Sequence, residues 1–224
     1  EREYFEMPTI GSRAPYFEAT TSSGPIVFPN DYEGKWVVFF SHPADFTPVC
    51  TTEFMTFQSR AKEFKALNCE LLGLSIDSLH SHIAWINSIE KYEYKDIKNQ
   101  KIEFPVIADI TQEVATLYNM VHPNVSDTNA IRAVFIIDPN SIIRTILYYP
   151  SSTGRNFDEI IRIIKALQTS DKEACATPAD WQPGEDVIVP PASTIKVARE
   201  RLAKPEGITC QDWFLCFKKT NSKK

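Results

Sequence analysis

Residues Ser41 to Glu53 read S-H-P-A-D-F-T-P-V-C-T-T-E, and this stretch decides the interpretation of the rest of the chain. The run before it, W-V-V-F-F at 36–40, is short, apolar and rich in β-branched and aromatic side chains, which is typical of a buried parallel strand. After the stretch, apolar side chains recur at steps of three and four, which predicts a helix with one apolar face. These side chains are Phe54, Phe57, Ala61 and Phe64.

Cys50 is expected near the start of that helix. Thr47 is a residue type that favours the N-cap, and Pro48 suits the first helical position because its missing N–H would have no partner there. This numbering places Cys50 at the third helical position, where free backbone N–H groups and the positive end of the helix dipole favour a thiolate. The alternative is a small apolar residue on a helix, and position alone leaves both interpretations open.

The surrounding letters carry a family resemblance. Pro43, Thr47 and Cys50 form the pattern P-x-x-x-T-x-x-C, which resembles the active-site signature of the peroxiredoxins. The longer string from Ser41 to Glu53 resembles the one-cysteine, peroxiredoxin-6-like branch. The resemblance implies a thiol-dependent peroxidase in which Cys50 attacks hydrogen peroxide or an organic hydroperoxide. It also implies that Thr47 positions the peroxide and that Pro43 shields the sulfur.

Hydrophobic patterning over residues 1–170 predicts alternating strands and helices. Two of the strands, at 131–137 and 142–148, are separated by so few residues that only an antiparallel hairpin can join them. The order of elements favours an α/β fold with a thioredoxin-like mixed sheet flanked by helices, forming a peroxidase domain. Further strands are expected at 14–17, 26–28, 36–40, 71–76 and 104–108, and further helices after 77–78, from 111 and after 156.

From about residue 171 the chain becomes rich in proline, which indicates an extended arm. We expect a small C-terminal α+β arm domain over 171–224, with a helix at 192–202 and a strand at 213–217. Peroxiredoxin-6-like proteins carry a C-terminal domain of this kind that packs on the partner subunit. The resemblance therefore implies a homodimer in which the arm serves dimerisation.

The resemblance also assigns supporting residues. Arg132, in the string A-I-R-A-V-F-I-I-D, falls where the catalytic arginine of the family lies, and its fixed donors suit it to hold both the sulfur and a peroxide oxygen. Glu53 resembles the glutamate that orients this arginine, although a first-turn Glu also has a helix-dipole explanation. Arg155 matches a second family arginine near the sulfur. His42 adjoins the motif, where it either influences access or is structural.

The fate of the oxidised sulfur depends on which thiol reduces its sulfenic acid. Thr47 stands where thioredoxins carry a second cysteine, so no local disulfide can form. Cys175 lies near the resolving cysteine of two-cysteine relatives but is displaced by two positions, and Cys210 and Cys216 are weaker candidates on the arm. Cys69 opens a predicted strand and is expected to be inert. We therefore expect an external thiol, such as glutathione or a thioredoxin-like protein, to act as the reductant.

The composition argues against several classes of partner. Lys and Arg number 24 against 29 Asp and Glu, so the net charge of −5 gives no indication of nucleic acid or of an anionic membrane. No apolar run reaches the roughly eighteen residues of a membrane helix, so no membrane insertion is expected. Five cysteines at irregular spacing do not describe a secreted disulfide framework, so we expect a reducing, cytoplasmic compartment.

We expect neither a cofactor nor a metal. The four histidines show no metal-ligand spacing, since His80 and His82 lie two apart on a predicted helix and face different ways. We also expect no serine-dependent lipase activity, because Lys35 stands where some peroxiredoxin-6-like proteins carry the serine and Pro29 where they carry its histidine. The rival to the peroxidase is a peroxide sensor or holdase chaperone that Cys50 oxidation switches.

Overall fold

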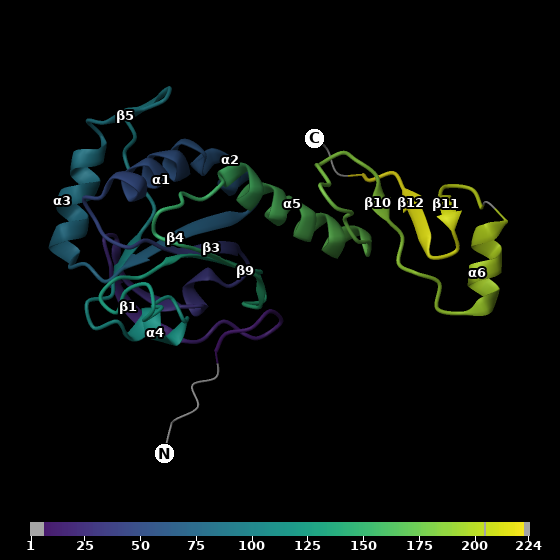
Figure 1. The fold of residues 1–224 in the computed structure, drawn as a ribbon, viewed down its shortest axis with the longest axis horizontal. Helices are drawn as coiled ribbons and strands as arrows, with labels where there is room; N and C mark the ends of the chain where they lie inside the picture. Colours follow the sequence, from purple (N-terminus) through teal and green to yellow (C-terminus); the bar gives the residue numbers. More distant parts are fainter. Residues whose placement is uncertain (1–6, 204, 222–224) are drawn as a thin grey trace, which may run out of the picture. The chain divides into compact units, whose positions relative to one another are not determined.

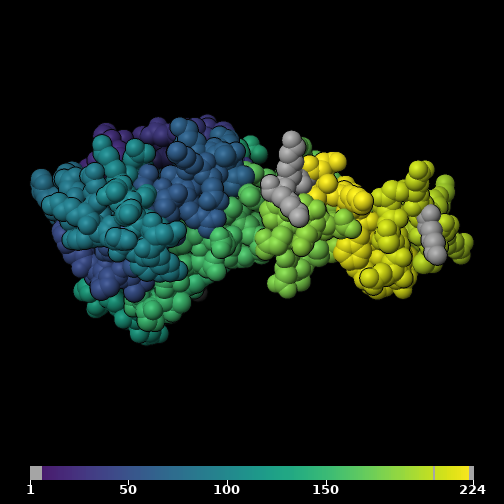
Figure 2. Space-filling model, turned by 90° about the horizontal axis from the view of Figure 1, so that it is seen from above, coloured from purple at the N-terminus to yellow at the C-terminus, as the bar shows by residue number. Residues whose placement is uncertain are grey.

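A computed structural model describes residues 7–203 and 205–221 of the protein. The chain divides into two compact units, Glu1–Phe157 and Asp158–Lys224, and Figure 2 colours the residues by their position along the sequence from purple to yellow. The outer ends of the two predicted domains, residues 1–6 and 222–224, lie outside the described residues. The predicted domain boundary between residues 170 and 171 stays a prediction.

The first unit is built on one seven-stranded sheet with the strand order β2-β1-β7-β4-β3-β8-β9 (Figure 1). Strands β3, β4 and β7 run parallel, and every other pair in this sheet is antiparallel. Figure 1 shows the sheet with α1 and α2 on one side and α4 on the other. This is the expected mixed sheet flanked by helices.

The strands of this unit are β1 Phe17–Thr21, β2 Gly24–Phe28, β3 Trp36–Ser41, β4 Cys69–Ser75, β5 Glu93–Tyr94, β6 Ile97–Lys98, β7 Val106–Ala108, β8 Arg132–Ile137 and β9 Ile143–Tyr149. The helices are α1 Pro48–Ser59, α2 Ala61–Ala66, α3 Leu79–Ile89 and α4 Glu113–Leu117, and a 3-10 turn spans Asn30–Tyr32.

Strand β3 forms the centre of the core because both of its faces are covered. All six of its residues are buried, as the apolar run in the sequence predicts. Since side chains alternate along a strand, Phe39 packs on one face against Tyr118 with ring centroids 4.9 Å apart. Phe40 packs on the other face against Phe57 of α1, at 4.1 Å. This second contact fixes α1 against the end of β3, where the chain turns toward Cys50.

The structure corrects several of the predicted elements, and the strand expected at 14–17 is β1 at Phe17–Thr21. The single helix expected from Cys50 through Phe64 is two helices, because Arg60 leaves helical geometry at φ −104° and ψ 7°. Threonine hydroxyls along α1 donate back to carbonyls three or four residues earlier, a bond that competes with the helix and bends it. The helix expected from residue 111 begins at Glu113, and the polar link after α3 contains the small hairpin β5–β6.

The second unit contains helix α5, Phe157–Glu173, whose first residue belongs to the first unit, and helix α6, Ile195–Leu202. Its sheet has the order β10-β12-β11, with β10 Val187–Ile188, β11 Thr209–Asp212 and β12 Leu215–Lys218. The expected solitary strand at 213–217 is therefore wrong, since it lies at 215–218 between two partners. No helix within residues 7–203 and 205–221 combines the length and apolar character needed to cross a membrane.

Candidate active site

Cys50 lies at the third residue of α1, as the sequence predicts. The helix begins at Pro48 with Thr47 in extended geometry at the N-cap, and the Cys50 side chain is fully buried. The Thr47 hydroxyl accepts no cap hydrogen bond from the helix, and it donates its proton to the Ala44 carbonyl at 2.6 Å. Its oxygen lone pairs therefore remain able to accept a hydrogen bond.

Arg132, the first residue of β8, contacts the sulfur directly. Its Nη1 donates to Cys50 Sγ at 3.2 Å and to Glu53 Oε1 at 2.6 Å. The remaining edge of the guanidinium is held by the Ser151 carbonyl, which accepts from Nε at 2.9 Å and from Nη2 at 2.7 Å. Because bonds on both edges orient the plane of the group, the donor that faces the sulfur is held in place.

Glu53 joins the two arginines of the site. It lies one turn beyond Cys50 on α1, is 2% exposed, and its Oε2 accepts from Arg155 Nε at 2.7 Å and from the Arg155 backbone N–H at 2.9 Å. Burial by itself raises the pKa of this carboxyl, but the charge and hydrogen bonds of Arg155, with the charge of Arg132, outweigh burial and lower the pKa. Glu53 is therefore an anion shared by two cations, which leaves an excess positive charge beside the sulfur.

Arg155 ties together elements that are distant in sequence. Its Nη1 donates to the carbonyl of Ser41 at 2.7 Å and to that of Ala133 at 2.8 Å, so it bridges the ends of β3 and β8. Its guanidinium also lies over the rings of Phe40 and Phe57, at 5.4 and 5.9 Å from their centroids. The family resemblance predicts Arg155 near the sulfur, and in the structure its guanidinium donates to Glu53.

Sequence reasoning missed Ser41 as a member of this site. Its hydroxyl donates to the Ile131 carbonyl at 2.6 Å and accepts from the Ala133 N–H at 3.1 Å, which holds the start of β8 beside the end of β3. Ser41 is the first residue of the 41–53 stretch, and this position was the feature of the sequence that could have indicated its role. Pro43, also in the motif, is buried in the loop that leads from β3 to α1.

His42 lies in a second buried group that spacing in the sequence did not reveal. Its Nε2 lies 2.7 Å from Asp45 Oδ1, and His82 Nδ1 lies 2.6 Å from Asp45 Oδ2. His80 is exposed, so it does face away from His82 as expected, but the structure brings His42 to His82 instead. The expectation that the histidines lack any ligand-like grouping is therefore wrong.

The distances in this group are those of hydrogen bonds. The potential ligand atoms of His42, Asp45 and His82 lie within 4.8 Å of one another. Two ligands bound at about 2 Å to one tetrahedral zinc would lie about 3.3 Å apart, whereas a hydrogen bond between nitrogen and oxygen spans about 2.7 to 3.2 Å. We therefore describe the group as a hydrogen-bonded chain, and the absence of a metal stays a prediction.

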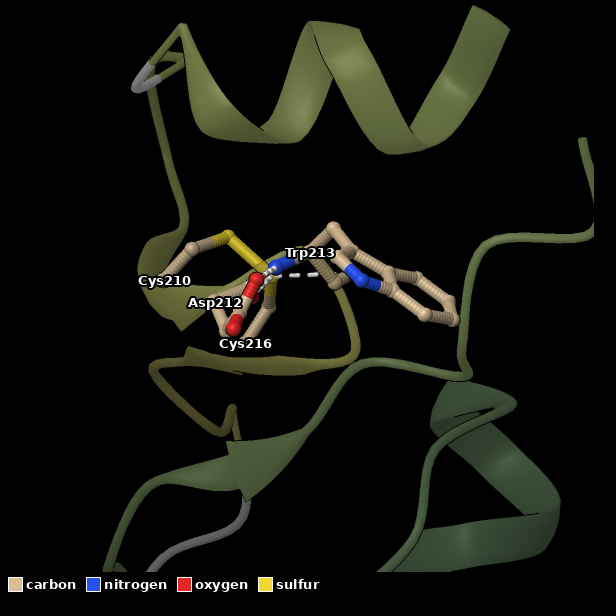
Figure 3. Close-up of a disulfide and its surroundings, with 4 residues drawn as sticks. All are labelled: Cys210, Asp212, Trp213 and Cys216. Atoms are coloured by element: carbon tan, nitrogen blue, oxygen red, sulfur yellow. Dashed lines mark hydrogen bonds between the residues drawn. A yellow bond between two sulfur atoms is a disulfide. The ribbon is translucent and has the colours of Figure 1, made fainter. Parts of the chain in front are cut away.

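The other cysteines are held in different ways. Cys69 is buried, and burial raises its pKa to about 12. Cys175 is half-buried, with its pKa raised mainly by burial, and its Sγ donates to the Thr169 carbonyl at 3.8 Å. Cys210 and Cys216 form a disulfide between β11 and β12, beside the exposed Trp213 and beneath α6 in the view of Figure 3. Cys210 and Cys216 were predicted only as separate resolving candidates, so their pairing is a finding of the structure.

The chain matches known protein families over most of its length. Residues 10–146 match the AhpC/TSA family, and residues 166–204 match the C-terminal domain of 1-Cys peroxiredoxin. Curated relatives named peroxiredoxin include a protein of Methanosarcina mazei, 61% identical over 97% of this chain and 100% of its own length. Another, of Thermotoga maritima, is 54% identical over 95% of this chain and 98% of its own length.

Solved structures show the same similarity. Yeast mitochondrial 1-Cys peroxiredoxin, studied for its thiol resolving mechanism via the glutathione and thioredoxin systems, is 42% identical with a TM-score of 0.81, covering 95% of this chain and 100% of that one. A mutant of peroxiredoxin 6 of Arenicola marina is 34% identical with a TM-score of 0.80, covering 94% of this chain and 97% of that one.

Proposed function

Since this chain belongs to the peroxiredoxin family, in its one-cysteine branch, and is a thiol-dependent peroxidase, we propose that Cys50 is the sulfur that reacts with peroxide. The observation that carries the proposal is the 3.2 Å hydrogen bond from Arg132 Nη1 to Cys50 Sγ. The guanidinium places a positive charge in contact with the sulfur, where negative charge is carried and passed on during attack on a peroxide.

The reaction is a displacement at oxygen. The Cys50 sulfur forms a bond to one peroxide oxygen, the O–O bond breaks, and the electron pair goes to the leaving oxygen, which takes up a proton to become water or an alcohol. The sulfur is oxidised to a sulfenic acid. Negative charge therefore moves from the sulfur to the leaving oxygen, so a cation that touches the reacting atoms stabilises both ends of the step.

Arg132 is the cation that we assign to this role. Its bonds to Glu53 and to the Ser151 carbonyl fix its plane before the peroxide arrives, so no reorganisation is needed during the reaction. We assign Arg155 to the support of Glu53, because it donates to both Glu53 oxygens.

Thr47 and Pro43 complete the proposed site. The Thr47 hydroxyl donates its proton to the Ala44 carbonyl in a hydrogen bond. The Thr47 hydroxyl oxygen would therefore accept a hydrogen bond from the peroxide O–H and orient the O–O bond toward the sulfur. Pro43 is buried in the same loop and offers no N–H, which suits the assignment that it keeps water from the sulfur. His42 joins the site as a supporting residue.

We further propose that an external thiol, such as glutathione or a thioredoxin-like protein, reduces the sulfenic acid. Three features support this proposal. Cys69 is buried with its pKa raised to about 12, Cys175 has a raised pKa, and Cys210 and Cys216 are joined to each other. A related 1-Cys peroxiredoxin of yeast is studied with the glutathione and thioredoxin systems. Substrates would include hydrogen peroxide and organic hydroperoxides.

A homodimer in the cytoplasm is the assembly and location that we propose. Strand β9 lies at the edge of the main sheet, and an edge strand carries unpaired backbone groups that can pair with a second chain. Tyr148 on this strand is 41% exposed. Light scattering of the whole chain should give twice the chain mass, and a monomer at micromolar concentration would contradict the proposal.

The decisive experiment for Cys50 is stopped-flow reaction of the reduced protein with hydrogen peroxide. Cys50→Ser should abolish the fast phase, while Cys69→Ser, which removes a buried thiol outside the site, should keep it. An equally fast Cys50→Ser variant would overturn the proposal. Steady turnover with glutathione or thioredoxin supports the peroxidase, whereas a single oxidation that no reductant reverses supports the peroxide sensor or holdase chaperone.

The origin of the reducing thiol is tested with a variant that keeps Cys50 as its only cysteine. If an external thiol suffices, this variant turns over peroxide with glutathione or thioredoxin as the wild type does. A variant that is oxidised at the normal rate but fails to turn over would show that an internal thiol is required. Single replacement of Cys175 or of Cys210 would then identify it.

A further inference from the structure

The chain of hydrogen bonds that begins at His42 runs away from the site into the core. Both His42 and His82 are fully buried, and so is the Asp45 side chain that lies between them. Besides the two imidazoles, Asp45 Oδ2 accepts from the Ser81 hydroxyl at 2.9 Å. The far end of the chain is the Ile107 carbonyl, 2.9 Å from His82 Nε2.

The partners of each atom determine where the protons lie. The Ile107 carbonyl can only accept, so His82 Nε2 carries a proton. Burial alone would raise the pKa of Asp45, but the hydrogen bonds from His42 and His82 outweigh burial and lower it. An ionised Asp45 can only accept, so His82 Nδ1 and His42 Nε2 both carry protons as well. In this arrangement His82 donates from both ring nitrogens, to Asp45 and to the Ile107 carbonyl.

His42 is the neutral member of the group. Burial lowers its pKa, against the opposing effect of Asp45. With its proton on Nε2, the ring presents Nδ1 as an acceptor, and this atom is buried without a hydrogen-bond partner among the described residues. Unsatisfied buried acceptors are rare in native proteins and often belong to functional sites.

The His42 ring lies beside residues of the Cys50 site. The ring packs edge-on against Phe54, one helical turn beyond Cys50, with centroids 4.8 Å apart. The residue before it, Ser41, offers its carbonyl to Arg155, which in turn holds Glu53. The O–H groups that this reaction brings to the site are those of the hydroperoxide and of the Cys50 sulfenic acid. A bare Nδ1 is suited to accept a hydrogen bond from such a group.

We propose that Asp45 and His82 are positioning residues of the peroxide site, which hold His42 neutral, with its proton on Nε2 and its Nδ1 free to accept an O–H. The inference rests on the proposed role of Cys50. Neither residue touches the reacting atoms, and both act through the His42 ring. Asp77 is the other charged group at the cluster, and its carboxylate accepts the Asp45 backbone N–H at 3.0 Å and the Ser75 hydroxyl at 2.6 Å.

The first test needs no change at the site. Two-bond proton–nitrogen correlation spectra of the reduced protein with labelled histidines separate the two neutral tautomers and the doubly protonated ring. The chain has four histidines, and His80→Gln and His122→Gln assign the two that lie outside the cluster. At neutral pH we expect His42 with its proton on Nε2 and His82 with both nitrogens protonated. A His42 protonated on Nδ1, or a neutral His82, would overturn the proposal.

The second test changes the positioning residues themselves. In Asp45→Asn, the amide nitrogen can turn toward His42 and move its proton to Nδ1, so the wrong tautomer should appear in the spectra. The stopped-flow rate of Cys50 oxidation should fall roughly 10- to 100-fold, the usual loss when an orienting partner is removed. His82→Asn keeps a hydrogen-bond donor toward Asp45 but removes the imidazole. Its rate of Cys50 oxidation should fall less than the rate of Asp45→Asn. His80→Gln, two residues away on α3, is the matched control and should react as the wild type does.

Ser81→Ala, which removes one donor to Asp45, provides a milder variant if the others do not fold. Folded variants with an altered His42 spectrum but a wild-type rate would show that the chain is structural and would overturn the positioning role. Failure of the proposed function gives a different result. In that case Cys50→Ser would react with peroxide as fast as the wild type, and the histidine spectrum of the wild type would still be as expected.

Discussion

Cys50 in the first unit and the Cys210–Cys216 pair in the second hold sulfur in contrasting ways. Cys50 and Cys216 are equally buried, each with no exposed surface. Cys50 remains a free thiol in contact with Arg132, whereas Cys216 is bonded covalently to a cysteine six residues away on the neighbouring strand. Burial therefore does not tell a reactive sulfur from a structural one. The partners of the sulfur differ, and at Cys50 the partner is the guanidinium of Arg132, which lies far away in sequence.

The largest expected effect comes from removing the anion beneath the Cys50 site. Glu53→Ala leaves Arg132 and Arg155 as buried cations without their shared partner, and breaking such a pair typically costs about 3 to 5 kcal/mol of the free energy of unfolding. Urea unfolding measures the loss. Glu63→Ala, which breaks the more exposed pair with Arg60, is the control and should cost no more than about 1 kcal/mol. Equal losses of unfolding free energy in the two variants would mean that the buried pairs of Glu53 contribute no more to stability than an exposed pair.

The next effect is on the rate of the chemical step. Arg132→Gln removes the charge that contacts Cys50 Sγ, and loss of one preorganised donor typically lowers a rate about 100- to 1,000-fold. Stopped-flow oxidation by hydrogen peroxide measures it. Arg144→Gln, on the neighbouring strand β9, removes an arginine that pairs with Asp138 instead and should leave the rate unchanged. A wild-type rate in Arg132→Gln would show that the contact with Arg132 does not make Cys50 reactive.

Breaking the disulfide should affect only the second unit. Cys210→Ser opens a loop of a few residues, which in the chain-entropy model costs about 2 kcal/mol. Hydrogen exchange should quicken in β11 and β12, and the first peroxide step at Cys50 should be unchanged. Cys175→Ser is the control for a lost thiol, and titration of unfolded wild type without reductant should find three free thiols. A slower first step in Cys210→Ser would show that the two regions are coupled.

The smallest expected effect is a dependence of stability on pH, which arises from the carboxylates of the first unit and not from the disulfide of the second. Asp45 and Glu53 have pKa values in the folded chain below their ordinary values of 3.8 and 4.5. A carboxylate whose pKa falls on folding stabilises the fold above its ordinary pKa, and this contribution is lost as the pH drops through the folded value. Urea midpoints should therefore fall as the pH drops below about 4.5. The disulfide does not titrate. At low pH the backbone amides of β11 and β12 should therefore still exchange more slowly in the disulfide-bonded protein than in the reduced protein.

Much of the fold follows from local patterning. The apolar run at 36–40 predicts a strand buried on both faces, and β3 is buried along its whole length. The short link after residue 137 predicts the antiparallel hairpin of β8 and β9, and Thr47 and Pro48 predict the start of α1. These features depend on neighbours in sequence. The break at Arg60 and the partners of β12 do not, and both were predicted incorrectly.

The sequence alone predicts Cys50, Thr47 and Pro43 as site residues, because their spacing lies within one strand-to-helix turn and matches a family pattern. It could also single out Arg132, Glu53 and Arg155, but only through that resemblance. Tertiary structure alone decided that Glu53 is shared by both arginines and that His42 and His82 meet on Asp45. It also decided that Cys210 and Cys216 are paired. The physical reason is that hydrogen bonds and ion pairs depend on distances of a few ångströms, which residues tens of positions apart acquire only when the sheet brings their strands and helices together.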